Sequence, residues 1–157
     1  MRRFELSAID GSPERALTIL HDPEQKPPYL SEPAVASLEA FLRARQTRTA
    51  ADQARALHLL RPTYPRYLVM ADVLFGRLDD AFTGLADPRL DPEATGQLLF
   101  EPLMVPVRQD PRFWPVAARA GLVDYWRRRG VWPDFRRDPA HPIDCQRAAD
   151  RAAPPRR

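Results

Sequence analysis

The residues through which this chain could do chemistry are few and scattered. Its histidines, His21, His58 and His141, lie far apart in the sequence, whereas a metal site needs His, Cys or acidic ligands clustered at short, regular spacing. Cys145 lies four residues after His141, but Pro142 between them disfavours the helix that would bring both onto one face. We therefore expect no metal and no cofactor.

The serines and the one adjacent pair of acids have structural explanations. Nucleophilic catalysis needs a serine or cysteine held beside a base, but Ser12 and Ser31 each precede a predicted helix, where a serine caps the first turn. Asp79 and Asp80 fall in the first turn of another predicted helix, where their charge suits the helix dipole. The two groups of a catalytic acid–base pair lie in different environments, and nothing in the sequence indicates such a difference between these two acids. The sequence predicts that the protein is not an enzyme.

Aromatic and arginine side chains are concentrated near the end of the chain. The expected role of this segment is a hydrophobic cap that covers the last helices of a helical array. The alternative is an aromatic–arginine surface for a nucleic acid or an acidic partner. The aromatic residues are Trp114, Tyr125, Trp126, Trp132 and Phe135. The arginines of the alternative surface are Arg127, Arg128, Arg129, Arg136 and Arg137.

The charge composition favours the first of these roles. The net charge is only +3, because 21 acidic residues offset the 24 basic ones. Lys26 is the one lysine, and asparagine is absent, as expected of a GC-rich, bacterial genome. An arginine-rich composition of this origin does not require a nucleic-acid surface, so nucleic acid is not the expected partner.

The hydrophobic pattern predicts helices and no strands. Helix-start signals recur along the chain, namely a capping Ser, Thr or Asp followed by an early proline or acid, and alternating β-branched runs are missing. The expected helices span 13–21, 31–45, 49–61, 64–75, 78–86, 92–100, 111–120 and 124–129. Pro102 and Pro106 are expected to break the stretch between the sixth and seventh helices.

These helices are expected to form one domain. The short joint between 31–45 and 49–61 predicts an antiparallel pair, and Gly76 provides the turn of a second pair. We expect a single helical-repeat domain over 1–137, including its terminal cap, and an irregular, flexible tail over 138–157. The sequence has no apolar run of membrane-spanning length and no signal peptide, so a cytoplasmic protein without a membrane partner is expected.

The segment 68–92 resembles one tetratricopeptide repeat. In that family a glycine ends the first helix, a large apolar residue follows two positions later, and a small alanine packs between the paired helices. The matching residues are Leu68, Gly76, Leu78, Ala81, Leu85 and Pro92. The pattern departs at Val69, where the family prefers a small residue, and at Asp72, where it prefers an aromatic one.

The segment 100–135 resembles the C-terminal end of bacterial tetratricopeptide proteins. Such proteins often carry a DNA-binding or cyclase domain at their N-terminus, and this chain contains neither. The resemblance, from Leu68 to Phe135, implies an all-α fold of antiparallel helix hairpins closed by a Pro- and Trp-rich cap. Its motifs are Phe100 with Pro102, Asp110-Pro111-Arg112-Phe113, Gly121-Leu122, Tyr125-Trp126 and Trp132-Pro133-Asp134-Phe135.

The resemblance also implies a binding site, because the first helix of each pair lines a groove in this family. The corresponding residues are Arg66, Tyr67, Met70 and Val73. Arg66 would pair with a carboxylate, and Met70 would supply adaptable apolar contact. The implied function is a bacterial regulatory module that recognises a protein segment or a small molecule without catalysis. The alternative is an accessory nucleic-acid-binding protein.

Overall fold

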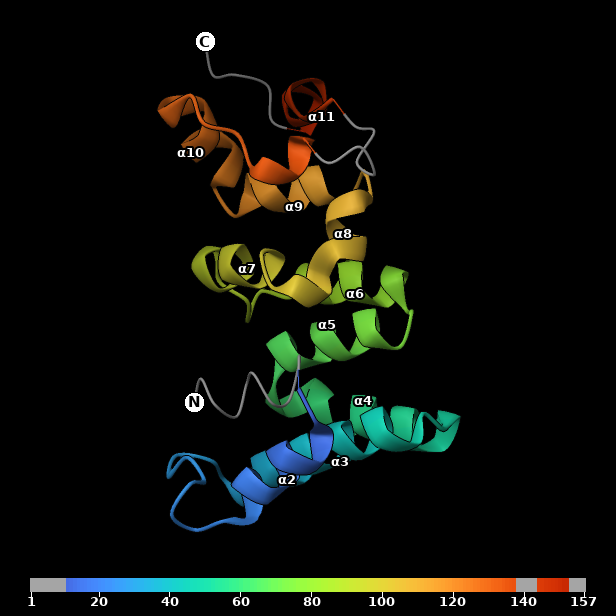
Figure 1. The fold of residues 1–157 in the computed structure, drawn as a ribbon. Helices are drawn as coiled ribbons and strands as arrows, with labels where there is room; N and C mark the ends of the chain where they lie inside the picture. Colours follow the sequence, from blue (N-terminus) through green and yellow to red (C-terminus); the bar gives the residue numbers. More distant parts are fainter. Residues whose placement is uncertain (1–10, 138–143, 153–157) are drawn as a thin grey trace. The chain divides into compact units, whose positions relative to one another are not determined.

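The chain folds entirely into helices in the part that the structure describes. The computed structural model describes residues 11–137 and 144–152, and every regular element in these ranges is helical (Figure 1). The all-α prediction is therefore confirmed. The chain divides into two compact units, Met1–Gly84 and Leu85–Arg157.

The first unit is organised around α3. Its helices are α2 (Pro13–His21), α3 (Glu32–Thr47), α4 (Ala50–Thr63), α5 (Pro65–Leu74) and α6 (Leu78–Leu85). Two of the expected side-chain caps form: the Ser12 side chain accepts a hydrogen bond from the Arg15 N–H, and the Thr49 side chain accepts one from the Asp52 N–H. Ser31 occupies the cap position of α3, but its side chain makes no capping hydrogen bond. α3 packs against both α2 and α4.

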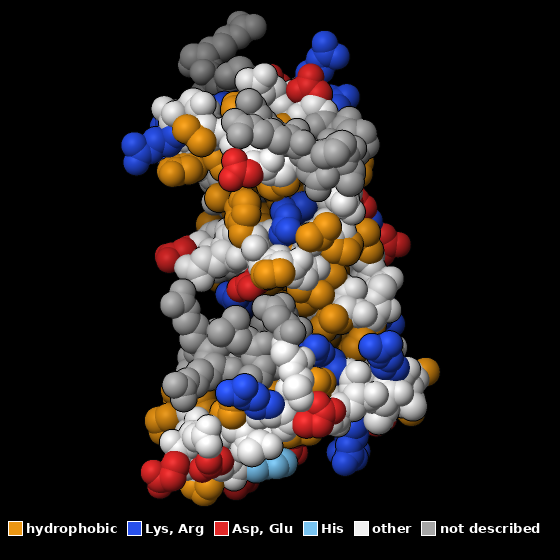
Figure 2. All heavy atoms as spheres, in the orientation of Figure 1, with side chains coloured by type: hydrophobic (Ala, Val, Ile, Leu, Met, Phe, Trp, Pro, Cys, Tyr) orange, Lys and Arg blue, Asp and Glu red, His pale blue; other side chains and the backbone are white. Residues whose placement is uncertain are grey.

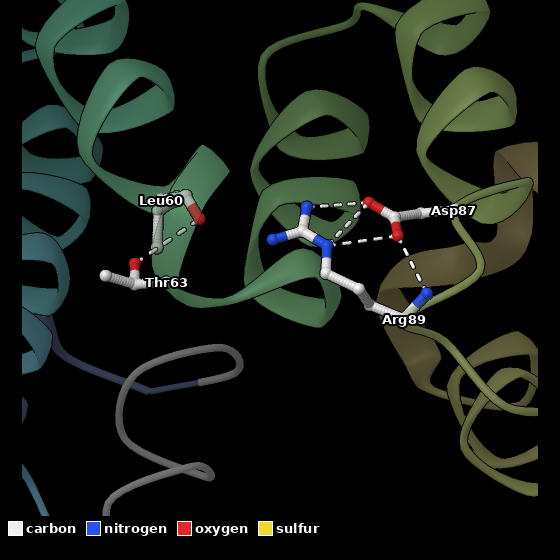
Figure 3. A network of polar contacts seen from close by, with 4 residues as sticks. All are labelled: Leu60, Thr63, Asp87 and Arg89. Atoms are coloured by element: carbon white, nitrogen blue, oxygen red, sulfur yellow. Dashed lines mark hydrogen bonds and ion pairs between the residues drawn. The ribbon is translucent and has the colours of Figure 1, made fainter.

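The end of α4 differs from its prediction. Pro62 was expected to stop the helix, but the helix runs to Thr63, so the proline lies in its last turn. There the Thr63 hydroxyl lies 2.8 Å from the Leu59 carbonyl. The same hydroxyl lies 3.3 Å from the Leu60 carbonyl (Figure 3). The Ser37 hydroxyl of α3 lies 3.1 Å from the Leu59 carbonyl as well. These hydroxyls provide hydrogen bonding around the proline, which has no N–H of its own.

The second unit is organised around α9. Its helices are α7 (Pro92–Leu99), η1 (Pro102–Met104), α8 (Val105–Gln109), α9 (Phe113–Arg119), α10 (Leu122–Arg129), η2 (Asp134–Arg137) and α11 (Cys145–Ala152). α9 packs against α7, α8, α10 and α11. The stretch around Pro102 and Pro106 is divided into short elements, as expected. Both prolines lie in the first turns of η1 and α8, where a missing N–H costs no hydrogen bond.

The predicted irregular tail contains a helix. Residues 145–152 form α11, whose Cys145, Ala148 and Ala149 are buried. These small residues recur at the three- and four-residue spacing of one helix face, and that face packs on α9. Residues 138–143 and 153–157 of the predicted tail lie outside the described residues.

Six aromatic rings fill the second unit and form what we call the aromatic cluster: Phe100, Phe113, Trp114, Trp126, Trp132 and Phe135. Phe113 and Trp114 have their ring centroids 5.1 Å apart, and Trp114 and Trp126 lie 6.1 Å apart, both pairs edge to face. Arg119 adds a hydrogen bond to the Leu85 carbonyl. Phe113, Trp114 and Trp126 are buried and contribute to the core of this unit, whereas Phe100 is 45% exposed.

Candidate functional site

The groove predicted along α5 is not formed by the predicted residues. Met70 is fully buried, and Tyr67 and Val73 are 4% and 8% exposed. The Tyr67 ring meets Phe41 of α3 edge to face, with centroids 6.2 Å apart. Of the four predicted residues, only Arg66 keeps part of its side chain at the surface. The residues of α5 from Tyr67 to Val73 are all buried, so Tyr67, Met70 and Val73 lie in the core and do not form an open surface.

The arginines of the alternative surface are only partly available. Arg127 forms ion pairs with Asp150, at 2.6 Å, and with Asp124, at 3.8 Å. Arg128 and Arg129 are exposed. Arg136 and Arg137 lie in η2, but their side chains lie outside the described part of the structure. The face of the molecule in Figure 2 carries acidic side chains among its basic ones.

Tyr125 and Arg129 do come together, as the alternative requires. The guanidinium carbon of Arg129 lies 5.9 Å from the centre of the Tyr125 ring, and Tyr125 is 49% exposed. The two residues line a groove of about 480 Å³, which also includes Trp132 and Asp134. Asp134 places a negative charge in the same groove.

A second pocket in this unit was not predicted from the sequence. It has a volume of about 410 Å³ and lies between α9 and α11. We call it the α9–α11 pocket. One wall consists of Pro111, Trp114 and Pro115, and the other of Ala148, Arg151 and Ala152. The pocket escaped prediction because α11 was expected to be irregular, although the spacing of its alanines was a readable signal.

Trp114, which lines the α9–α11 pocket, also has a buried, unsatisfied donor. The residue is 1% exposed, and its indole N–H has no hydrogen-bond partner among the described residues. Buried polar groups in folded proteins nearly always have a partner, and an unmet donor typically costs about 1–3 kcal/mol.

Arg151 brings a positive charge to the same pocket. It makes no ion pair with another residue of the ranges 11–137 and 144–152. The acids nearest to the pocket residues in sequence are already neutralised, since Asp150 pairs with Arg127 at 2.6 Å and Asp110 pairs with Arg112 at 2.8 Å. Arg151 is therefore the uncompensated charge of the pocket wall.

Two Asp-Pro-Arg turns in this unit account for two shifted carboxyl groups. In each turn the aspartate accepts the backbone N–H of the arginine two residues later, at 2.8 Å, and also binds its guanidinium. Figure 3 shows the first turn, Asp87 with Arg89; the second is Asp110 with Arg112. The arginine hydrogen bonds lower the pKa of both aspartates below the ordinary value. Each of these two carboxylates stabilises its own turn.

Asp72 is the buried carboxylate of the first unit. Its Oδ1 accepts a hydrogen bond from the Arg77 Nε at 3.1 Å, and Arg77 also pairs with Asp80 at 2.8 Å. Burial raises the pKa of Asp72 above the ordinary value, and the bond from Arg77 opposes that rise. These contacts join the end of α5 to the start of α6, so Asp72 has a structural role in this turn.

The histidines do not come together in the described part of the chain. His21 pairs with Glu39 of α3, and His58 is exposed. His141 lies outside the described residues. Within the ranges 11–137 and 144–152, no three His, Cys, Asp or Glu residues are grouped to hold a metal ion. No helix in those ranges has both the length and the apolar character that crossing a membrane requires.

Comparisons of the chain with family models, with curated proteins and with solved structures give no match. The geometry of the α9–α11 pocket is therefore the main guide to function.

Proposed function

We propose that the chain is a non-catalytic binding module and that the α9–α11 pocket is its ligand site. The observation that carries the proposal is the Arg151 guanidinium, which has no ion-pair partner among the described residues, at a pocket whose other walls are apolar. Ligand pockets typically combine apolar walls with a few polar groups that orient the ligand. The tetratricopeptide-like groove of α5 has no part in this proposal.

The shifted carboxyl groups support a non-catalytic role. Strongly shifted pKa values often mark catalytic groups, but here each shifted aspartate has a structural partner. Asp72 joins two helices through Arg77, and Asp87 and Asp110 hold turns. Their shifts follow from burial or from these bonds, so none needs a reaction to explain it.

We propose further that α5 and α6 form a tetratricopeptide-like pair. Gly76 adopts φ +74 at the turn between them, a left-handed conformation that favours glycine. Ala81 and Leu85, which match the family pattern, are fully buried. The small residue that the family places at position 69 is replaced by Val69, and Gly84 lies opposite to it. This pair acts as a scaffold.

The proposal is tested with a fragment screen on the full chain. The screen includes acids, their neutral amides and short peptides, and binding is detected by ligand NMR and by tryptophan fluorescence. Ala152→Leu, which adds bulk to the pocket wall, should abolish binding, while Arg128→Ala on the exposed face of α10 should leave it unchanged. A screen without any binder, or a binder that is indifferent to Ala152→Leu, would overturn the proposal.

Nucleic-acid binding is the second candidate, favoured by the Tyr125–Arg129 contact. Stacking of a base on an exposed ring contributes about 1–3 kcal/mol, and phosphate contacts make binding steeply dependent on salt. A titration of single-stranded DNA and RNA across salt concentrations, with Tyr125→Ala and Arg129→Glu, separates the candidates. We expect weak binding that disappears at physiological salt. Tight binding that both substitutions abolish would promote this candidate.

A further inference from the structure

We infer that the α9–α11 pocket takes a small organic acid, that is, a carboxylate on an apolar ring or short branched chain. This inference rests on the proposed function and adds the ligand class to it. Three properties of the pocket carry the argument: the hydrogen-bonding character of its walls, its charge and its size.

Among the described residues of the walls, Arg151 supplies the polar side chain that a ligand can reach. Its guanidinium donates hydrogen bonds, whereas the proline and alanine walls have no polar side chains and the Trp114 N–H is buried. Pro111 and Pro115 also lack a backbone N–H. A ligand that complements these walls brings acceptor oxygens and an apolar body. A peptide brings backbone N–H groups as well, and the described side chains of the walls provide no acceptor for them.

The charge of the pocket favours an anion. Arg151 is uncompensated, while Asp110 and Asp150 are each held by another arginine. Arg151 and Ala152 lie at the C-terminal end of α11, and the dipole there corresponds to about half a negative charge. The full positive charge of the guanidinium outweighs this partial charge, and its planar fork matches the two oxygens of a carboxylate.

The size of the pocket limits the ligand. Its volume of about 410 Å³ is near the lower end of the range of roughly 300–1,000 Å³ for ligand pockets. The walls are mainly apolar, which disfavours a strongly hydrated ion such as phosphate. One aromatic ring with a short alkyl group and one carboxylate satisfies the volume, the donors and the charge together.

The test uses 4-isopropylbenzoate as the probe and 4-isopropylbenzamide as its neutral counterpart. Isothermal titration with the full chain should show the acid binding at least about tenfold more tightly than the amide, because hydrogen bonds to charged groups are the stronger ones. Acetate, which lacks the apolar body, and inorganic phosphate should bind weakly. An acetylated tripeptide ending in valine tests the peptide alternative.

Substitutions assign the preference to named groups. Arg151→Gln should remove most of the acid-over-amide preference, and Arg151→Lys should restore part of it. Arg147→Gln is the matched control, because Arg147 lies on the same helix with its side chain 84% exposed and pairs with Asp144. Trp114→Phe keeps a ring but makes this apolar wall smaller, so binding of the acid and of the amide should weaken together. Circular dichroism and thermal melting check that each variant is folded.

The outcomes separate this inference from the proposed function. Equal binding of the acid and the amide, with both lost in Ala152→Leu, overturns the acid class and leaves the pocket as a binding site. Tighter binding of the tripeptide than of the acid also overturns the acid class. An acid preference that survives Arg151→Gln overturns the assignment to Arg151. If neither these probes nor any member of the screen binds, the proposed function fails as well.

Discussion

Gly84 of α6 faces Val69 of α5 so closely that a Cβ atom at position 84 would lie 2.7 Å from the Val69 Cγ2. Real Cβ contacts are essentially never this short. The close approach of the two helices therefore depends on Gly84. The sequence had indicated Ala81 as the residue at their close contact. Val69 occupies the space that a small residue would leave open, and Gly84 makes that possible.

Gly84→Ala should destabilise the protein. Overpacking of this kind costs about 1–3 kcal/mol, which exceeds the gain of roughly 1 kcal/mol that alanine brings to a helix interior. Val69→Ala removes the Cγ2 atom that would clash. The double variant, Gly84→Ala with Val69→Ala, should therefore lose less stability than the sum of the losses in the two single variants. Urea denaturation measures all three variants.

Gly96→Ala is the matched control for that prediction. A Cβ at Gly96 of α7 would meet the Leu122 Cδ2 at 3.8 Å, an ordinary contact. The substitution should therefore stabilise the protein by up to about 1 kcal/mol. If both glycine substitutions shift stability in the same direction, the close approach at Gly84 is refuted.

Ala81→Leu should also destabilise the protein, by about 1–3 kcal/mol, because added methylenes have no room in a packed core. Ala81 is fully buried. Asp80→Ala is the comparison, since it removes an exposed partner of Arg77, and an exposed ion pair contributes only about 0–1 kcal/mol. Thermal melting of both variants tests the prediction, and an unchanged melting temperature for Ala81→Leu would contradict it.

Asp72→Asn should leave the protein as stable at neutral pH as it was, or make it more stable. The folded pKa of Asp72 is raised from 3.8, so ionisation costs more in the folded state than in the unfolded one. Its contribution to stability falls as pH rises from 3.8 through the folded pKa. Denaturation curves recorded across that pH window should show the variant becoming more stable relative to the wild type as pH rises. A strong loss at neutral pH would show that the Arg77 contact outweighs burial.

Glu14→Gln should have the opposite pH dependence. Hydrogen bonds from Ser12 and Gln46 lower the pKa of Glu14 from 4.5 to about 2. The carboxylate therefore stabilises the folded state above pH 4.5, and that contribution is lost as pH falls toward 2. The variant should be less stable than the wild type at pH 6, and the gap should close in acid. A stability difference between the two proteins that does not change with pH would contradict this titration of Glu14.

Ala149→Asp should loosen α11 from α9. Ala149 is fully buried, and a charged group placed there without a partner typically costs at least about 1–3 kcal/mol. Because α11 packs on α9 and lines the pocket with Trp114, the tryptophan fluorescence should shift to longer wavelength. Gln146→Asp, at an exposed position of the same helix, is the control. Equal effects of the two substitutions would argue against the packing of α11.

The sequence by itself determined the helical class and most helix boundaries. Ser12, Thr49 and Asp91 cap helices with their own side chains, and these bonds reach only three residues along the chain. Prolines in first turns and glycines with positive φ act over similarly short distances. Signals of this kind are complete within a short window of sequence, so they can be read without knowing the fold.

The tertiary structure alone decided which surfaces are buried and where a pocket forms. The apolar run of α5 did not reveal that Tyr67 and Met70 would be enclosed, because that depends on helices supplied by distant segments. The same holds for Val69 facing Gly84, and for α11 meeting Trp114 across more than thirty residues of sequence. Periodicity identifies the apolar face of a helix, but the partner that covers the face is set by packing among all the helices.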